Sequence, residues 1–90
     1  MHRIYLGGDN EKGGIRFSRF DVSRVLSSQG IEGFTLIPAY GIWKGATEET
    51  WIIEISSDPG QDIGALVQYL KVFFKQDAIG LVNVGEFTLV

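Results

Sequence analysis

Residues 33–55 decide the fold; they read GFTLIPAYGIWKGATEETWIIEI. This stretch holds two β-rich runs, which predict strands over 33–43 and 49–55, joined by a short connection over 44–48. Two strands this close in sequence predict a hairpin. Pro38 has no backbone N–H, so the first strand needs an edge position, a bulge or an unpaired site there.

Upstream of the hairpin, the sequence predicts a strand, a loop and a helix. Apolar and polar residues alternate over 3–7, which is typical of a strand. The glycine-rich, polar run over 7–14 is typical of a loop. A helix is expected over 19–29, because Ser18 can cap its N-terminus and Gly30 can end it.

Downstream of the hairpin, the sequence predicts a second helix and a further strand. Asp58 followed by Pro59 is typical of a helix start, and the apolar periodicity predicts a helix over 59–75. A strand follows over 79–84, and residues 86–90 either continue it past a bulge or form a short fifth strand. The order β-α-β-β-α-β predicts a ferredoxin-like α+β fold, with a four-stranded antiparallel sheet and two helices on one face. The other face must be solvated or covered by a partner.

Length and composition bound the class of protein. Ninety residues predict one domain, 1–90, with a thin core. There are no cysteines, so disulfides cannot add stability, and burial against other copies of the chain is the expected alternative. The sequence holds no apolar run of about 20 residues and no signal segment. We therefore expect a cytoplasmic protein without a membrane partner.

The charged residues narrow the possible chemistry. Eight Lys and Arg face eleven Asp and Glu, for a net charge of −3, and the cations are scattered, which argues against a nucleic-acid polymer as partner. One histidine and no cysteine argue against a zinc site and against Cys or Ser–His nucleophiles. No metal and no cofactor are expected. Any catalysis must come from carboxylates, tyrosines, backbone groups and substrate positioning.

Glu54 is the most unusual residue, because it interrupts an apolar strand. Alternation puts Ile53 and Ile55 toward the helices and Glu54 on the open face, near Arg3 or Tyr5 of the first strand. Two interpretations stay open. Glu54 is either a solvent-facing carboxylate on an exposed sheet or, if another subunit covers this face, a partly buried carboxylate whose partner can be a cationic ligand.

Other candidates are weaker. Trp43 lies between two glycines and can stack on a base or hold a cation; the alternative, which the composition favours, is an ordinary hairpin turn with solvated charges. The glycine loop after the first strand lacks a phosphate-binding or dinucleotide motif, and is either a ligand contact or a connector. Gln76 is either a helix exit or part of a site. Asn83 interrupts the last apolar strand and is expected on the Glu54 face.

A family resemblance adds to this interpretation. Residues 20–35, FDVSRVLSSQGIEGFT, resemble the first helix and second strand of PII-type signalling proteins. That family forms compact trimers whose sheets face inward, with small nucleotides bound in clefts between subunits. The resemblance covers the whole chain in element order and implies a PII-like homotrimer. PII proteins carry a long loop between strands two and three, which residues 44–48 replace, so nitrogen signalling is not implied.

Among short-loop relatives, the chain is most similar to phage-type S-adenosylmethionine (SAM) lyases. The similar features are IYLGG over 4–8, GIWKG over 41–45, the pair Glu48-Glu49, and a glutamate in the third strand. The resemblance implies cleavage of SAM, or of its AMP conjugate (SAM-AMP), to methylthioadenosine, or its AMP conjugate, and homoserine lactone. The substrate's own carboxylate attacks the carbon next to the sulfonium. Related lyases that act on SAM-AMP counter phage defence.

The resemblance also assigns candidate residues. Glu54 and Tyr40 are the predicted catalytic residues. The predicted substrate-binding residues are Tyr5, Gly7, Gly8, Trp43, Glu48, Glu49, Gln76 and Asn83. Glu54 would anchor the α-ammonium or sulfonium end of the substrate, while aromatic side chains surround the sulfonium or the adenine. The alternative functions are a non-catalytic PII-like sensor that binds an adenine nucleotide between subunits and an oligomer without a ligand.

Overall fold

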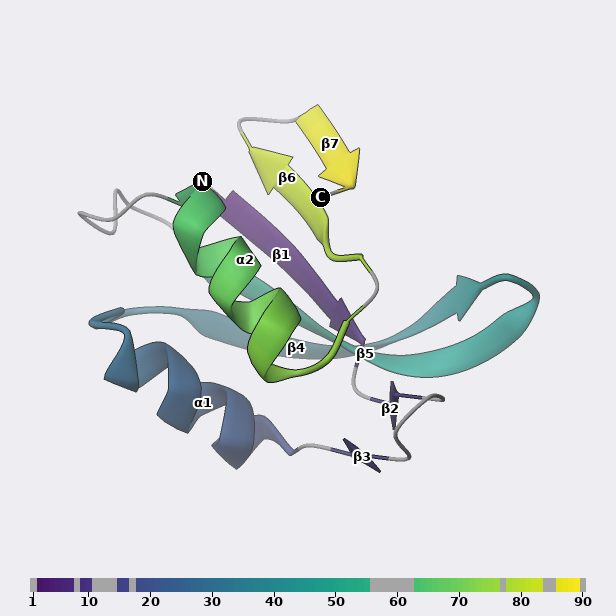
Figure 1. Ribbon diagram of the computed structural model, residues 1–90, viewed down its shortest axis with the longest axis horizontal. Helices are drawn as coiled ribbons and strands as arrows, with labels where there is room; N and C mark the ends of the chain where they lie inside the picture. Colours follow the sequence, from purple (N-terminus) through teal and green to yellow (C-terminus); the bar gives the residue numbers. More distant parts are fainter. Residues whose placement is uncertain are drawn as a thin grey trace.

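The computed structural model describes residues 2–7, 9–10, 15–16, 18–55, 63–76, 78–83 and 86–89. The elements, in chain order, are β1 (His2–Gly7), β2 (Asp9–Asn10), β3 (Ile15–Arg16), α1 (Arg19–Ser28), β4 (Thr35–Trp43), β5 (Ala46–Ile55), α2 (Ile63–Phe73), β6 (Gly80–Asn83) and β7 (Glu86–Leu89) (Figure 1). The predicted β-α-β-β-α-β order is confirmed by β1, α1, β4, β5, α2 and β6.

The main sheet has the strand order β4-β5-β1-β6-β7, and every neighbouring pair is antiparallel. Its four strands β4-β5-β1-β6 form the ferredoxin-like arrangement that the sequence predicts. Both helices lie on one face of the sheet (Figure 1). The question about residues 86–90 is answered by β7, which pairs with β6 as a fifth strand at the sheet edge. The short strands β2 and β3 pair separately, next to and partly inside the predicted 7–14 loop.

The connection predicted over 44–48 is wrong. The hairpin turns in only two residues, and β5 already begins at Ala46. Lys44 and Gly45 both have positive φ, 52° and 80°, which is the turn geometry that matches the twist of paired strands. Two-residue turns of this kind usually carry Asn-Gly, and this one carries Lys44-Gly45. The sequence therefore does not indicate where the turn lies.

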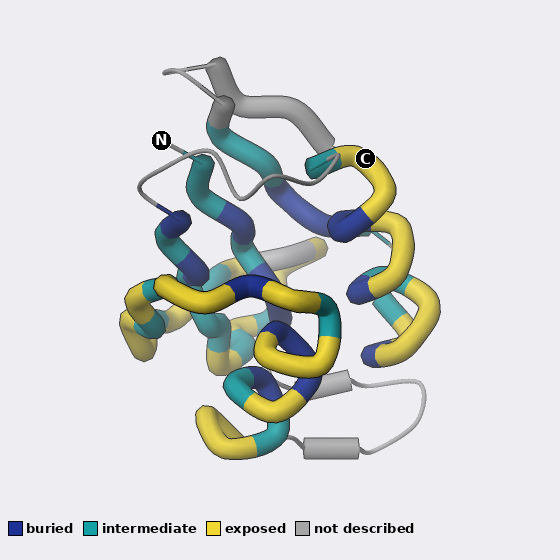
Figure 2. Tube along the Cα trace, turned by 90° about the vertical axis from the view of Figure 1, so that its left-hand side faces the viewer, coloured by how far each residue is buried: buried dark blue, intermediate teal, exposed yellow. Residues whose placement is uncertain are grey.

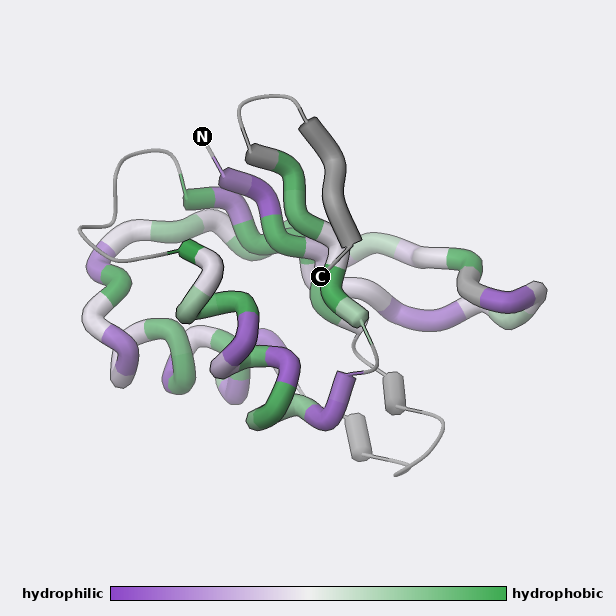
Figure 3. Tube along the Cα trace, turned by 45° about the horizontal axis from the view of Figure 1, so that its top comes forward, coloured by the Kyte–Doolittle hydropathy of each residue, from purple (hydrophilic) through white to green (hydrophobic). Residues whose placement is uncertain are grey.

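The β4–β5 hairpin is longer than the rest of the sheet. β1 pairs with β5 only from Thr50 onward, while β4 and β5 pair with each other as far as Trp43 and Ala46. Residues 40–49 therefore form a two-stranded extension, which we call the hairpin arm. It projects beyond both helices, at the right of Figure 1, and its tip around Lys44 is hydrophilic (Figure 3).

The two helices end in the same way with different residues. After α1, the Gly30 amide donates to the Ser27 carbonyl and the Ile31 amide to the Leu26 carbonyl, with φ of 82° at Gly30. This is a Schellman motif with its preferred glycine. After α2, the amides of Lys75 and Gln76 make the equivalent bonds, with φ of 54° at Lys75. This turn ends α2 at Phe73 rather than at residue 75, and the expected start at residues 59–62 lies outside the described residues.

The start of α1 is a capping box. The Asp21 amide donates to the Ser18 hydroxyl at 3.4 Å, and the Ser18 amide donates to the Asp21 carboxylate at 2.8 Å. The hydrogen bond from the Ser18 backbone, followed by the one from its hydroxyl, lowers the pKa of Asp21. The helix start predicted at Ser18 is confirmed.

The core lies between the helices and one face of the sheet (Figure 2). Its fully buried side chains come from β1, α1, β5, α2 and the segment before β6: Ile4, Leu6, Val22, Leu26, Ile53, Ile55, Val67, Leu70 and Ile79. Ile53 and Ile55 are buried, while Ile52 and Glu54 are only partly covered. The alternation predicted along the third strand is therefore confirmed.

Candidate functional site

The first polar cluster lies on the open face of the sheet, where β1 and β5 run side by side. Arg3 and Glu54 are direct register partners. The Arg3 Nε donates to Glu54 Oε2 at 2.8 Å, and Nη2 of the same guanidinium donates to the same oxygen. The hydrogen bond to Glu54, followed by one to Tyr5, raises the pKa of Arg3 above its ordinary value. We call Arg3, Tyr5 and Glu54 the open-face cluster.

This cluster settles how Glu54 is held in one chain. Its side chain is 22% exposed and that of Arg3 is 36% exposed, so the pair is half-covered rather than fully solvated. Glu54 is therefore partly buried already in one chain, where its cationic partner is Arg3. Cover by another subunit and a cationic ligand at Glu54 stay predictions. The sequence offers Arg3 only as a possible neighbour, because its role depends on β1 lying beside β5.

A second polar cluster lies at the end of β1, where Gly7, Glu48 and Gln76 meet. Gly7 lies beyond Tyr5–Gly80, the last residue pair of β1 with β6. A Cβ placed on Gly7 would lie 3.0 Å from Gln76 Oε1 and 3.2 and 3.3 Å from the two Glu48 carboxylate oxygens. A side chain on Gly7 would therefore require these oxygens to move by a few tenths of an ångström. We call these three residues the β1-end cluster.

Hydrogen bonds fix the orientation of the Gln76 amide. Its Nε2 donates to the Gly7 carbonyl and to the Phe74 carbonyl, both at 3.1 Å. The reverse orientation would place the amide oxygen against two carbonyl oxygens, which cannot bond to each other. Oε1 of Gln76 is therefore an acceptor that lies over Gly7, on the same side as the Glu48 carboxylate.

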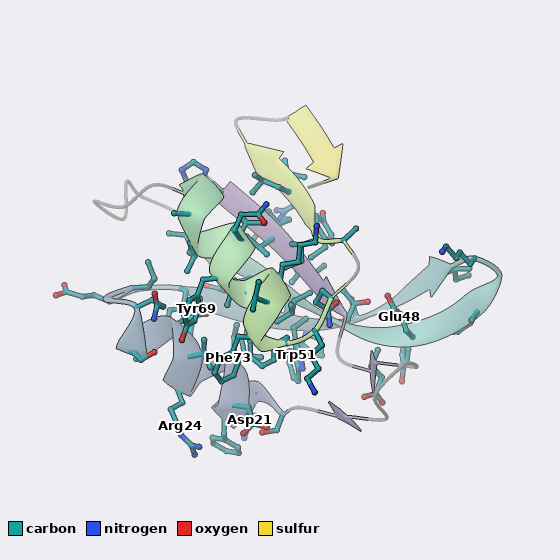
Figure 4. All side chains as sticks on the ribbon, in the orientation of Figure 1. Asp21, Arg24, Glu48, Trp51, Tyr69 and Phe73 are labelled. Atoms are coloured by element: carbon teal, nitrogen blue, oxygen red, sulfur yellow. The ribbon has the colours of Figure 1, made fainter. Side chains whose placement is uncertain are left out.

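The two clusters are far apart within one chain. Glu48 and Glu54 are six residues apart on β5, and both occupy the phase of the strand opposite to Ile53 and Ile55. At about 3.3 Å per residue, they are separated by roughly 20 Å along the strand. Figure 4 shows Glu48 on the hairpin arm, away from the centre of the sheet. The predicted site residues therefore do not form a single site in one chain.

Tyr40 and Glu49 lie elsewhere. They are register partners on the hairpin arm, in the strand phase opposite to Glu48 and Glu54. Tyr40 is 79% exposed. The structure thus does not bring Tyr40 or Glu49 toward either cluster of the same chain.

The remaining predicted residues are only partly described. Gly8 lies outside the described residues, as do the side chains of Trp43 and Asn83. The backbone of Asn83 pairs with His2 rather than with Arg3. The side chain of Asn83 is not described, so its expected place on the Glu54 face stays a prediction.

The described residues offer limited means for metal chemistry. Within them, no group of three or more His, Cys, Asp or Glu side chains lies together in a way that could hold a metal ion. Neither described helix is long and apolar enough to cross a membrane. What the two clusters offer is a carboxylate paired with a guanidinium and a carboxylate beside an amide oxygen.

Comparison with known proteins supports the fold. No protein-family model matches the sequence, and no curated protein matches it either. Among solved structures, the chain is similar to a phage SAM lyase in its apo state, with a TM-score of 0.65. The two share 20% sequence identity, and the match covers 99% of this chain and 86% of the lyase chain. The resemblance drawn from the sequence is confirmed at the level of the fold.

Proposed function

We propose that this chain is a lyase that cleaves SAM or its AMP conjugate to methylthioadenosine, or the AMP conjugate of that product, and homoserine lactone. The observation that carries the proposal is the structural similarity to a phage SAM lyase over nearly the whole chain. The polar clusters and the half-covered open face of the sheet support it. The reaction also suits the composition, since it needs no cysteine, second histidine or metal.

The chemistry requires little more than positioning. A substrate carboxylate oxygen forms a bond to the carbon next to the sulfonium, and the carbon–sulfur bond breaks with its electron pair going to sulfur. The products are homoserine lactone and the neutral thioether, and no water or external base enters. Holding the methionine arm in a curled conformation can supply several kcal/mol, on the order of the gain from intramolecular geometry. The negative and positive charges cancel as the bond forms, so a site that excludes water favours the transition state.

We place this reaction in clefts between the subunits of a homotrimer. The amino group and the sulfonium of SAM are separated by only three carbon atoms, whereas roughly 20 Å separate Glu48 from Glu54 in one chain. One substrate can therefore meet both carboxylates only if they come from different subunits. The open face is suited to contact between copies, because Ile37 and Ile52 lie on it as register partners next to the charged pair.

The proposed roles follow from this arrangement. Glu54, held by Arg3, faces the positive sulfonium from one subunit, and Tyr5 lies two residues from Arg3 on the neighbouring strand β1. Tyr40 and Trp43 on the hairpin arm reach the substrate of a neighbouring subunit. Gly8, Glu49 and Asn83 complete the proposed set of substrate contacts.

A product assay tests the proposal directly. The purified protein is incubated separately with SAM and SAM-AMP, and the products are identified by mass spectrometry. We expect homoserine lactone together with methylthioadenosine or its AMP conjugate, and a trimeric mass by light scattering. Stabilisation by adenine nucleotides without turnover would favour the nucleotide sensor instead, and indifference to all of them would favour a ligand-free oligomer.

A further inference from the structure

The open-face cluster leaves one oxygen of Glu54 open. Nε and Nη2 of Arg3 both donate to Oε2, whereas in a bidentate pair each carboxylate oxygen accepts one of the two bonds. No hydrogen bond within the described part of the chain reaches Oε1. Among the described residues, the buried side-chain atom without a partner is Nδ1 of His2, so Oε1 of Glu54 is accessible to solvent. Glu54 therefore presents a negatively charged acceptor whose position is held by Arg3.

Arg3 keeps hydrogen-bond donors of its own. A guanidinium has five N–H groups. Two of them bond to Glu54 and one hydrogen bond joins Arg3 to Tyr5, so two of the five remain. The Arg3 side chain is 36% exposed, so a ligand on the open face can reach it. The cluster thus offers a positive donor and a negative acceptor side by side.

This pair of charges matches a zwitterion. A ligand with a single negative group is repelled by Glu54, and a ligand with a single positive group is repelled by Arg3. A ligand that carries both groups close together is attracted by both residues, because its charges alternate with theirs. In the curled conformation from which SAM would react, the carboxylate and the sulfonium lie on opposite sides of one carbon atom. The reacting end of SAM is therefore a ligand of this kind.

We propose that Arg3 binds the α-carboxylate of the substrate while Glu54 faces the sulfonium. This inference rests on the proposed function and deepens it, because it gives the attacking group a partner. Arg3 holds one carboxylate oxygen, and the other oxygen forms the bond to the carbon next to the sulfonium. The carbon–sulfur bond breaks with its electron pair going to sulfur, and no proton moves. The oxygen held by Arg3 becomes the carbonyl oxygen of the lactone.

Two ligands that cannot form the lactone separate the carboxylate from the sulfonium. S-adenosylhomocysteine has the carboxylate and a neutral thioether, whereas decarboxylated SAM has the sulfonium and no carboxylate. Both keep the adenosine and the amino group. Their affinities are measured by calorimetry for the wild-type protein and for Arg3→Met, Arg3→Lys, Glu54→Gln and Arg24→Met. Arg24 is an exposed residue of α1, so its variant makes the same charge change as Arg3→Met away from the cluster.

We expect Arg3→Met to weaken S-adenosylhomocysteine binding by about 10- to 100-fold, the effect of losing a hydrogen bond between charged groups. It should not weaken the binding of decarboxylated SAM, which has no group for Arg3 to hold. Glu54→Gln should show the opposite selectivity and weaken decarboxylated SAM by about 10-fold, because the charge that faces the sulfonium is lost. Arg24→Met should bind both ligands as the wild type does.

Arg3→Lys keeps the experiment decisive if Arg3→Met folds poorly. Lysine leaves a positive charge beside Glu54 but replaces the planar fork of donors by a single ammonium. We expect a smaller, still selective loss of S-adenosylhomocysteine binding for this variant.

The outcomes separate this inference from the proposed function. If the wild type forms product and binds both ligands, but the Arg3 variants lower both affinities equally or neither of them, Arg3 does not bind the carboxylate and the lyase proposal stands. Equal losses would mean that Arg3 acts only by holding Glu54. If the wild type forms no product and binds neither ligand, the lyase proposal fails and the assignment of Arg3 fails with it.

Discussion

Gly7→Ala is the sharpest test of the β1-end cluster, because a single added carbon meets three oxygens. The new Cβ would lie 3.0 Å from Gln76 Oε1 and 3.2 and 3.3 Å from the Glu48 oxygens, whereas ordinary contacts begin at 3.4 Å. The backbone of Gly7 is not in the left-handed region, so steric crowding is the only cost. The oxygens must move by a few tenths of an ångström, against the two hydrogen bonds that hold Gln76.

Because the crowded atoms are the ends of partly exposed side chains, we expect the low end of the cost of overpacking, about 1 kcal/mol. For a domain of this size, each kcal/mol lowers the melting temperature by roughly 4–8 °C, so we expect a fall in that range. Calorimetric melting at one fixed protein concentration measures it, since the melting temperature of an oligomer depends on concentration. S-adenosylhomocysteine affinity should fall as well, because both acceptors are displaced.

Gly33→Ala is the matched control. A Cβ on Gly33 meets nothing within 4 Å, and its φ is also outside the left-handed region. The control should be neutral or more stable by up to about 1 kcal/mol, because alanine restricts the unfolded chain. If Gly7→Ala has the same melting temperature as Gly33→Ala and binds S-adenosylhomocysteine equally well, the three oxygens do not crowd Gly7 and our description of the cluster is wrong.

Three further expectations concern the scaffold, each measured by thermal or urea unfolding. Ile53→Ala should cost about 2–5 kcal/mol because Ile53 is fully buried, while Ile52→Ala on the open face of the monomer should cost far less; equal losses would contradict the assigned strand phase. Lys75→Gly should stabilise the chain by about 1 kcal/mol, since glycine adopts positive φ without strain; a loss would contradict the Schellman geometry. Ser18→Ala should cost about 1 kcal/mol. Because the folded pKa of Asp21 is lowered, its contribution is full at neutral pH and is lost as the pH falls below about 4, and Asp21→Asn should remove this pH dependence.

The sequence predicts most of the scaffold because local rules act there. Alternation around Ile53 and Glu54 identifies the two faces of β5, and the Ser18 and Gly30 signals identify both ends of α1. The hairpin turn escapes prediction because Lys44 occupies a conformation that usually marks Asn or Gly. The local signal for a glycine-ended helix also fails at Lys75, where the backbone makes the same hydrogen-bonded turn although lysine disfavours positive φ.

The candidate site is less predictable because its contacts are long-range. Arg3 and Glu54 are 51 residues apart, and Gly7 and Gln76 are 69 apart. Glu54 is identifiable as an outlier in an apolar strand, but its partner depends on β1 lying beside β5. The sequence marks Gln76 as a candidate but does not show what its side chain contacts. Its amide donates to the carbonyl of Gly7, which lies beyond the last residue pair of β1 with β6.

The separation of Glu48 from Glu54 leads to a prediction about mixed oligomers. If the protein is the proposed trimeric lyase, Glu48→Gln and Glu54→Gln should each lose most of the activity and still form trimers. If a site takes Glu48 from one subunit and Glu54 from the next, random trimers of the two variants contain sites with both native carboxylates. Equal mixing, with unfolding and refolding to exchange subunits, should restore about one quarter of the wild-type activity, since each of the two positions is native in half of the subunits.

Several results would refute this arrangement. If both carboxylates act within one chain, every site in the mixture carries one defect, and mixing restores nothing. If either single variant is fully active, that carboxylate is not part of the site. A refolded mixture of wild-type protein with itself controls for losses in refolding, and the mixture must be trimeric for the comparison to hold. Recovery near one quarter would therefore assign the two carboxylates to different subunits, which the roughly 20 Å between them in one chain requires of any site that uses both.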